Sequence, residues 1–283
     1  MTNVLSHGIR RIDKILRTCA SFPRCLMAAL SACLCVFISI ESRADDDPSV
    51  LPYRPSVSNP AALPEPGWLE FEIGLFRESQ GSHSRDTTVP FMLEYAFTPD
   101  LGIILAGDAQ MVHTDPTSGR QRGQGDTTLL LKHHWSLDDG DDAPALGLEW
   151  GFTAPTAKRG MGCGKSDYVI TGIFSSQLRD NTLDINIGAR RLGEIEAGAD
   201  RVQWGWAVTL SRSLSAAWSV AGELSGISRS GAPPKGQALF ALGYTVSKRL
   251  VIDAGFAIGT NAAAPNHSVF VGLAYLFGPL HGH

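Results

Sequence analysis

The feature that restricts the fold most is an alternation of apolar with small or polar residues that persists from Gly67 to the end of the chain. A period of two is typical of β-strands whose faces meet different surroundings, and no comparable stretch repeats at the helical period of 3.6. The alternating segments cover residues 68–77, 88–97, 101–111, 126–136, 145–153, 167–178, 182–190, 202–212, 217–226, 237–246, 249–258 and 268–277. The chain is therefore predicted to be all-β, with an even number of strands, about 12.

The connections between these segments alternate in length. Long connections are expected at residues 78–87, 112–125, 154–166, 191–201, 227–236 and 259–267. Short ones lie between them, with one lapse at the Asp-rich connection 137–144. Bacterial outer-membrane barrels have short periplasmic turns and longer outer loops. The lengths therefore predict a transmembrane up-and-down antiparallel β-barrel over residues 67–277.

A soluble β-sandwich or lipocalin-like barrel would also alternate, but it would turn its apolar face inward. Two observations favour the inverted arrangement. The face opposite the apolar one is rich in glycine, alanine and charge, which suits a narrow lumen. Aromatic residues gather toward the segment ends, where an interfacial girdle would lie; they are Tyr95, Phe97, Trp135, Tyr168, Trp204, Trp218, Tyr275 and Phe277.

Residues 1–44 are predicted to be a signal peptide. A basic head precedes the apolar run at residues 25–40, and Ser42-Arg43-Ala44 provides the small residues that signal peptidase prefers. Cleavage is expected between Ala44 and Asp45. An uncleaved membrane anchor is one alternative, although the apolar run is short for a spanning helix. A lipoprotein is another, because Leu30-Ser31-Ala32-Cys33 matches its signal, but the following residues remain apolar.

Cleavage would leave a chain with 18 Lys and Arg against 26 Asp and Glu, and with Cys163 as its one cysteine. No internal disulfide or multi-cysteine metal site is then possible. His133 and His134 are adjacent and would point to opposite faces of a strand, so they cannot chelate one metal. An acidic exported chain is also a poor candidate for binding nucleic acid. We predict no cofactor, no metal and no nucleic acid partner.

Residues 45–66 contain six prolines and no apolar periodicity. They are predicted to form an irregular lead-in that lies in the periplasm or tucks into the barrel lumen. At the other end, residues 278–283 are predicted to be a short tail beyond the barrel.

The stretch RGMGCGKS at residues 159–166 is similar to a phosphate-binding loop. That pattern requires glycine six residues before the lysine, where this chain has Arg159. The residues after it, from Tyr168, alternate like a strand, whereas a phosphate cradle needs a helix N-terminus. We predict no nucleotide partner and place the stretch in the third outer loop, where Arg159 and Lys165 would face anionic lipopolysaccharide.

Several short motifs resemble a known family in the same order along the chain. They are RPSVS at 54–58, PGWLEFEIG at 66–74, GQGDTTLLLK at 123–132, FTAPT at 152–156 and GCGKSDY at 162–168. They are similar to the bacterial outer-membrane transporter family grouped under the MetA pathway of phenol degradation. The resemblance spans roughly residues 54–277. It implies a β-barrel that lets small, often aromatic or hydrophobic, compounds cross, and it brings no catalytic residues. This chain departs from the family in Cys163 and in the tail after Phe277.

If apolar side chains face lipid, a mostly acidic set faces the lumen. Its predicted members are Glu70, Glu72, Glu94, Asp108, Asp126, Lys132, His134, Glu149, Asp184, Arg190, Glu223 and Asp253. In one interpretation they line an acidic pathway that disfavours anions and tolerates neutral or cationic solutes. In the other they form a hydrogen-bonded plug, with Lys132 and Arg190 bridging carboxylates so that no buried charge is unpaired. The sequence leaves both open.

The predicted function is passive uptake of small hydrophobic or aromatic compounds by a channel in the outer membrane, among lipid and lipopolysaccharide. An outer-membrane hydrolase is an alternative, because His83, Ser84, His113, Ser228 and Ser230 are expected in outer loops. No spacing forces these residues together, so no catalytic site is predicted. A structural or adhesive barrel is the third possibility.

Overall fold

The computed structural model describes residues 48–280 except 55, 82–83, 118 and 141–142. The predicted signal peptide and its cleavage site lie outside the described residues. Within the described residues the chain forms the strands β1 (Leu69–Gln80), β2 (Ser84–Thr98), β3 (Leu101–Asp115), β4 (Gly119–Gly123), β5 (Thr127–Ser136), β6 (Ala145–Ala154), β7 (Asp167–Leu178), β8 (Asn181–Arg191), β9 (Val202–Ser213), β10 (Trp218–Arg229), β11 (Ala232–Ser247), β12 (Leu250–Gly259) and β13 (His267–Phe277). Within the described residues, no helix is long and apolar enough to cross a membrane.

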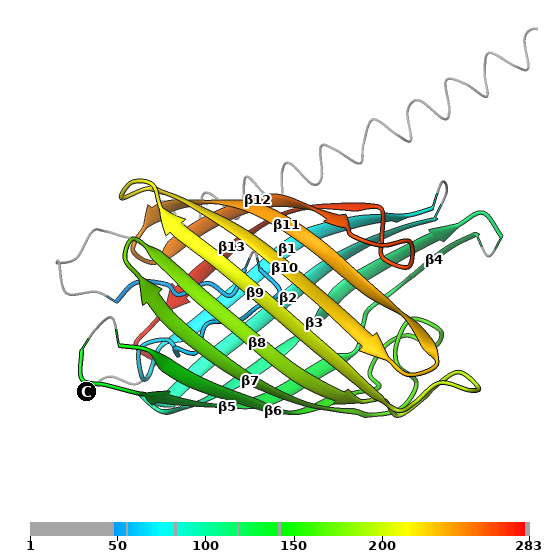
Figure 1. Cartoon of the computed structure of the whole chain (residues 1–283), viewed down its shortest axis with the longest axis horizontal. Coiled ribbons are helices and arrows are strands. Elements are labelled where there is room, and N and C mark those ends of the chain that lie inside the picture. Colours follow the sequence, from blue (N-terminus) through cyan, green and yellow to red (C-terminus); the bar gives the residue numbers. More distant parts are fainter. Residues whose placement is uncertain (1–47, 55, 82–83, 118, 141–142, 281–283) are drawn as a thin grey trace, which may run out of the picture. The chain divides into compact units, whose positions relative to one another are not determined.

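Consecutive strands pair antiparallel except β4 and β5, and β1 pairs with β13, which closes the sheet into a barrel. Only β4 stands outside the ring, because it pairs with the outer part of β3 while β5 takes over the inner part. Figure 1 shows the tilted strands of the barrel, with β4 in an extension at one end. The prediction of an up-and-down antiparallel barrel of about 12 strands is confirmed, with one additional strand.

Apolar side chains cover the outside of the barrel. Those of Tyr168 and Trp204 are 56% and 57% exposed, and Ile187 is 61% exposed. A continuous apolar surface of this kind would be unstable in water and suits the hydrocarbon of a bilayer. Aromatic residues group near the ends of the strands, as in the contacting pairs Tyr95–Phe97 and Trp218–Tyr244. The soluble barrel, with its apolar face inward, is therefore rejected.

Three of the expected long connections are largely strand. The alternation of apolar residues stops at the edge of the membrane band, but main-chain pairing continues beyond it. β10 and β11 pair up to Arg229 and Ala232, so only Ser230 and Gly231 turn, and Gly231 has the positive φ (+77°) that such a tight turn requires. Residues 78–87 and 112–125 are mostly extensions of β1, β2, β3 and β4 in the same way. The apolar pattern marks the membrane band and not the full length of a strand.

The described residues of 48–66, all but 55, are here called the inner segment; they lie inside the barrel, where Figure 1 shows them as the blue chain within the strands. They form neither helix nor strand, as expected of a proline-rich stretch without periodicity. At its beginning Val50 packs with Trp68, Ala274 and Leu276 near the short-turn end, which is the periplasmic end of such barrels. The segment therefore occupies the periplasmic part of the interior, called the lower lumen below.

Candidate functional site

The inner segment is held in the lower lumen by carboxylates that project from the barrel wall. Glu70 accepts a hydrogen bond from the main-chain N of Leu51 (2.9 Å) and Glu72 accepts one from that of Tyr53 (2.6 Å). The Tyr53 hydroxyl donates to Glu94 at 2.5 Å. These three glutamates are almost fully buried. Because a carboxylate only accepts hydrogen bonds, main-chain N–H groups of an irregular segment are suitable partners.

Arg54 anchors the segment on the side where the first and last strands pair. Its guanidinium lies 3.3 Å from Asp253 on β12. Beside it are Gly74 on β1 and its cross-strand partner Gly272 on β13. A Cβ atom at Gly74 would stand 2.5 Å from the Arg54 Cζ, and one at Gly272 would also collide with the guanidinium. The two glycines therefore form a slot that admits this flat group next to the wall.

The segment then crosses to the opposite wall. On β10, Glu223 accepts hydrogen bonds from the main-chain N of Val57 (2.7 Å) and of Ser58 (3.0 Å). The side chain of Asn59 donates to Glu149 on β6 at 2.9 Å. Its main chain also exchanges two hydrogen bonds with Asn186 on β8. The segment thus contacts walls on both sides of the lower lumen.

Lys132 on β5 is the one lysine of the predicted set, and its side chain is fully buried. The Nζ donates to the Pro60 carbonyl at 2.8 Å and lies 3.6 Å from Glu94 and 3.7 Å from Glu149. It also stands 4.0 Å from the centre of the Tyr53 ring. Lys132 therefore lies between two wall carboxylates and the inner segment. This is the bridging role that the plug interpretation gave it.

Two further predicted residues contact the segment or support its contacts. His134 Nδ1 lies 3.2 Å from the Ala61 carbonyl. Asp184 accepts a hydrogen bond from Ser175, whose hydroxyl oxygen in turn accepts one from the main-chain N of Ala61. The shared contact with Ala61 brings β5, β7 and β8 to the same part of the segment. Two buried oxygens of the wall, Glu70 Oε1 and Glu223 Oε1, have no hydrogen-bond partner within the described part of the chain.

The remaining predicted residues do not contact the inner segment. Asp108 lies higher on β3, where its carbonyl accepts from the main-chain N of Gly125. Arg190 lies near the long-loop end of β8, 3.9 Å from Asp167, so it does not bridge the lower carboxylates. Asp126 precedes β5 and binds the loop above the barrel, where it accepts hydrogen bonds from the main-chain N of Ala157 and of Cys163.

The stretch at residues 159–166 lies in the connection from β6 to β7, and a strand follows it. It therefore lacks the helix that a phosphate loop requires. Burial raises the pKa of the Cys163 thiol to about 11, and the hydrogen bond and negative charge of Asp126 add to this. Burial alone would raise the pKa of Asp126, but hydrogen bonds from Cys163, Ala157 and Thr156 outweigh it and lower that pKa. The thiol is therefore neutral and a weak nucleophile at pH 7.

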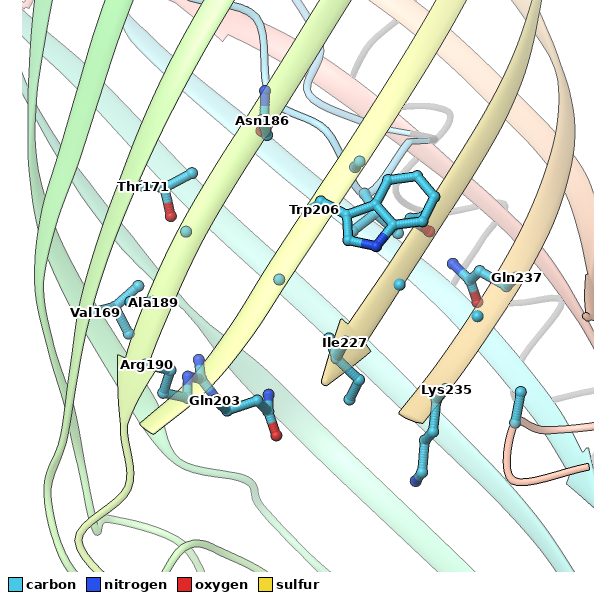
Figure 2. A pocket seen from close by; sticks show the side chains of 18 of the residues that line it. Val169, Thr171, Asn186, Ala189, Arg190, Gln203, Trp206, Ile227, Lys235 and Gln237 are labelled. Carbon is cyan, nitrogen blue, oxygen red and sulfur yellow. The ribbon is translucent and has the colours of Figure 1, made fainter. Parts of the chain in front are cut away.

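Above the inner segment the barrel contains a cavity of about 420 Å³, called the chamber below. Val57 and Asn59 of the segment form its floor, and Pro265 of the β12–β13 connection contributes to its lining. Figure 2 shows its wall on β7 to β11. The labelled polar and charged side chains of this wall are Thr171, Asn186, Arg190, Gln203, Lys235 and Gln237.

Most chamber residues were not among the sequence-predicted site residues. Ile227 and Lys235 were expected in the long connection 227–236, because the apolar pattern ends before them. Their alternation in the extended β10–β11 hairpin was the available signal, since Ile227 pairs with Lys235. No periodic signal could have shown that Val57 and Asn59 form a floor, because the inner segment is irregular.

His113, a candidate for a hydrolase, contacts Asp86 on the neighbouring strand through Nδ1. Within the described residues no serine hydroxyl is hydrogen-bonded to His113, and His83 lies outside them. No group of three or more His, Cys, Asp or Glu side chains in the described ranges is arranged to hold a metal ion. Among the described residues, His113 and Asp86 thus form an acid–histidine pair to which no serine hydroxyl is hydrogen-bonded.

The comparison with protein families is decisive for identity. Residues 54–277 match the model of the family described as "Putative MetA-pathway of phenol degradation". The chain belongs to this family. The match covers the inner segment from Arg54 and the whole barrel, and it confirms the resemblance found in the short motifs. No curated protein sequence matches the chain.

Solved structures are similar to the barrel of this family member at low sequence identity. The COG4313 outer membrane channel from Pseudomonas putida F1 aligns with a TM-score of 0.61 and 14% identity, over 84% of this chain and 100% of that channel. The NanC porin aligns with a TM-score of 0.50 and 11% identity, over 73% of this chain and 98% of the porin. At this identity the similarity is one of fold, which is that of outer-membrane barrels.

Proposed function

We propose that the protein is an outer-membrane channel for the passive uptake of small hydrophobic or aromatic compounds. The observation that carries the proposal is the chamber of about 420 Å³ inside the barrel. Its volume lies within the range of small-molecule sites, roughly 300 to 1,000 Å³. Its lining combines apolar side chains such as Val57, Val169 and Ile227 with a few polar ones, which is the usual composition of such sites.

The comparisons support the type of solute and the type of protein. The family to which the chain belongs is described by a pathway of phenol degradation. The two similar structures are named as an outer membrane channel and as a porin. A member of this family with a chamber of this size is suited to admit a single-ring compound.

After a solute has entered the chamber, the inner segment lies between it and the periplasm. Because it lies across the lower lumen, a solute that travels through the lumen to the periplasm must displace or deform it. The contacts that hold it include hydrogen bonds from its main chain to wall carboxylates, together with the Arg54–Asp253 pair. Such contacts can be exchanged for water one at a time, so the segment can shift without the barrel opening.

The connection from β6 to β7 would face the outer leaflet. Arg159 and Lys165 are exposed in it. We assign them to contacts with the anionic groups of lipopolysaccharide, because exposed cations near a membrane surface are attracted to anionic lipid. No catalytic role is proposed, since His113 contacts Asp86 and no serine within the described residues.

The test is the entry of labelled phenol into proteoliposomes that contain lipopolysaccharide, relative to vesicles without protein. Gly205→Phe fills the chamber, because Gly205 lies in its wall and a Cβ there would have Ile227 as its nearest neighbour at 3.8 Å. This variant should reduce entry to near the level of empty vesicles. The matched control is Gly222→Phe on the outer face of β10, where a Cβ meets nothing within 4 Å.

Equal entry with wild type, Gly205→Phe and Gly222→Phe would rule out the chamber as the route. No protein-dependent entry of phenol or of any other small solute would reject the channel and favour the structural or adhesive barrel. Heat-dependent mobility in gels should confirm that each variant is folded.

A further inference from the structure

The chamber and the lower lumen differ in charge. The residues that line the chamber include two cations, Arg190 and Lys235, and no aspartate or glutamate. The carboxylates that hold the inner segment lie below it. The carboxylates that interact with the two cations, Asp167 and Glu78, are not among the residues that line the chamber. A solute in the chamber therefore meets a positive environment, although the chain as a whole has more acidic than basic residues.

Arg190 retains hydrogen-bonding capacity. Its side chain is 42% exposed, and its nearest carboxylate, that of Asp167, lies 3.9 Å away, beyond hydrogen-bond length. Asp167 itself accepts a hydrogen bond from the main-chain N of Gly193 at 2.9 Å. Gln203 is the cross-strand partner of Arg190, and Figure 2 shows the two side chains next to each other. Within the described residues, the guanidinium donates no hydrogen bond to the protein.

Next to Arg190 and Gln203, on the same face of the same two strands, lies a pair of glycines. Gly188 on β8 is the cross-strand partner of Gly205 on β9. Thr171 pairs with Gly188 on one side, and Ile227 pairs with Gly205 on the other. The wall is open at Gly205, where the nearest atom to a Cβ would be in Ile227 at 3.8 Å, whereas the Thr171 hydroxyl would stand 2.8 Å from a Cβ at Gly188 and covers part of that glycine. In the lower lumen, the glycine pair Gly74 and Gly272 admits the flat guanidinium of Arg54 next to the wall.

We infer that the chamber binds small aromatic carboxylates, with the carboxylate at Arg190 and Gln203 and the ring over Gly205. A guanidinium binds a carboxylate through two parallel hydrogen bonds, and an amide beside it can add another. Ile227 would contact the ring edge. The inference rests on the proposed channel function and names the solute class that the chamber favours.

Lys235 contributes at longer range. It lies on β11 in the same row as Gly188, Gly205 and Ile227, so two strands separate it from the strand of Arg190. The Glu78 carboxylate interacts electrostatically with the Lys235 ammonium. Its ammonium therefore attracts an anion into the chamber rather than binding it together with Arg190, and its loss should reduce entry less.

The test compares the entry of benzoate and of benzyl alcohol into proteoliposomes at pH 7. The two have the same ring, and benzoate is the anion. Arg190→Gln should reduce benzoate entry roughly tenfold or more, because a hydrogen bond to a charged group is removed, and should change benzyl alcohol entry much less. Lys235→Gln should have a smaller effect of the same sign. Arg212→Gln, which removes an exposed arginine paired with Asp180 near the short-turn end, is the control for overall charge.

Two further variants keep a cation at position 190, so they control for misfolding and for a change at Asp167 when Arg190 is removed. Arg190→Lys keeps the charge without the paired donors and should fall between wild type and Arg190→Gln. Gln203→Glu places a negative charge beside an intact Arg190 and should also reduce benzoate entry. If benzyl alcohol and benzoate enter equally and no variant separates them, the inference is overturned and the channel stands. If neither solute enters through the wild-type protein, the channel itself is rejected.

Discussion

The lower lumen and the chamber are two parts of one barrel interior, and they differ in what occupies them. In the lower lumen the wall presents carboxylates and a glycine slot, and the inner segment fills both through Tyr53, Arg54 and Ser58. In the chamber the wall presents cations and a second glycine pair, of which Gly188 is partly covered by Thr171 and Gly205 would have no neighbour closer than 3.8 Å to a Cβ. The alternation of apolar and polar residues along the strands forms the barrel wall. The inner segment determines which part of that wall a solute can reach.

Removing the inner segment should have the largest effect on the difference between the two parts. A chain that lacks residues 48–66 should conduct ions several-fold better than wild type in planar bilayers, because the lower lumen is then filled with water. It should also become cation-selective, since Glu70, Glu72 and Glu94 would face that water. Conductance and reversal potential in a salt gradient measure both effects. Unchanged conductance in a folded deletion variant would mean that the segment does not obstruct the lumen.

Replacing the anchor of the segment should have the next largest effect. Arg54→Ala leaves Asp253 buried without its partner and leaves the slot at Gly74 and Gly272 unfilled. Loss of one member of a buried pair should lower the free energy of unfolding by about 3 kcal/mol, measured by urea titration in detergent. Arg212→Ala removes a partner from the exposed pair with Asp180 and should lower it by less than about 1 kcal/mol. Equal losses in the two variants would contradict the role of Arg54 as an anchor.

Replacement of one glycine of each pair by valine compares the lower lumen with the chamber directly. Gly74→Val introduces a Cβ that would stand 2.5 Å from the Arg54 Cζ, and overpacking of this kind should lower the free energy of unfolding by about 1 to 3 kcal/mol. Gly205→Val introduces a Cβ whose nearest neighbour is 3.8 Å away, and it should leave stability unchanged or improve it, because valine favours strands. Urea titration should separate the two variants. A similar loss at Gly205 would show that the chamber is not open there.

The smallest expected effect concerns the loop above the chamber. Because burial and Asp126 raise the pKa of Cys163 to about 11 from the ordinary 9.0, alkylation should be slow at pH 8 and should still accelerate above pH 10. Asp126→Asn removes a negative charge and an acceptor, so it should lower this pKa and speed alkylation at pH 8 several-fold. Maleimide labelling at a series of pH values measures this, and Asp139→Asn in a distant exposed turn is the control. A rate that levels off near pH 9 in wild type would contradict the shift.

The barrel could be predicted from the sequence because a period of two assigns a face to every residue of a strand. That assignment placed Glu70, Glu94, Glu149 and Glu223 on the face opposite the apolar one, and the structure buries all four inside the barrel. Strand ends were harder to predict, because lipid marks only the membrane band, and Lys235 was therefore expected in a loop. The partners of the carboxylates could not be predicted. Arg54 and Asp253 are 199 residues apart, and the irregular inner segment has no period that would set its path.

The position of Arg54 has a consequence for how the barrel is completed. Its guanidinium touches the first strand at Gly74 and the last at Gly272, and it pairs with Asp253 on the strand next to the last. These groups come together only when the end of the chain has met its beginning. The inner segment therefore cannot take its final position while the sheet is incomplete. Arg54 of this segment contacts both strands at the point where the finished barrel closes. For this chain, closure of the barrel and placement of the inner segment are therefore one step of assembly.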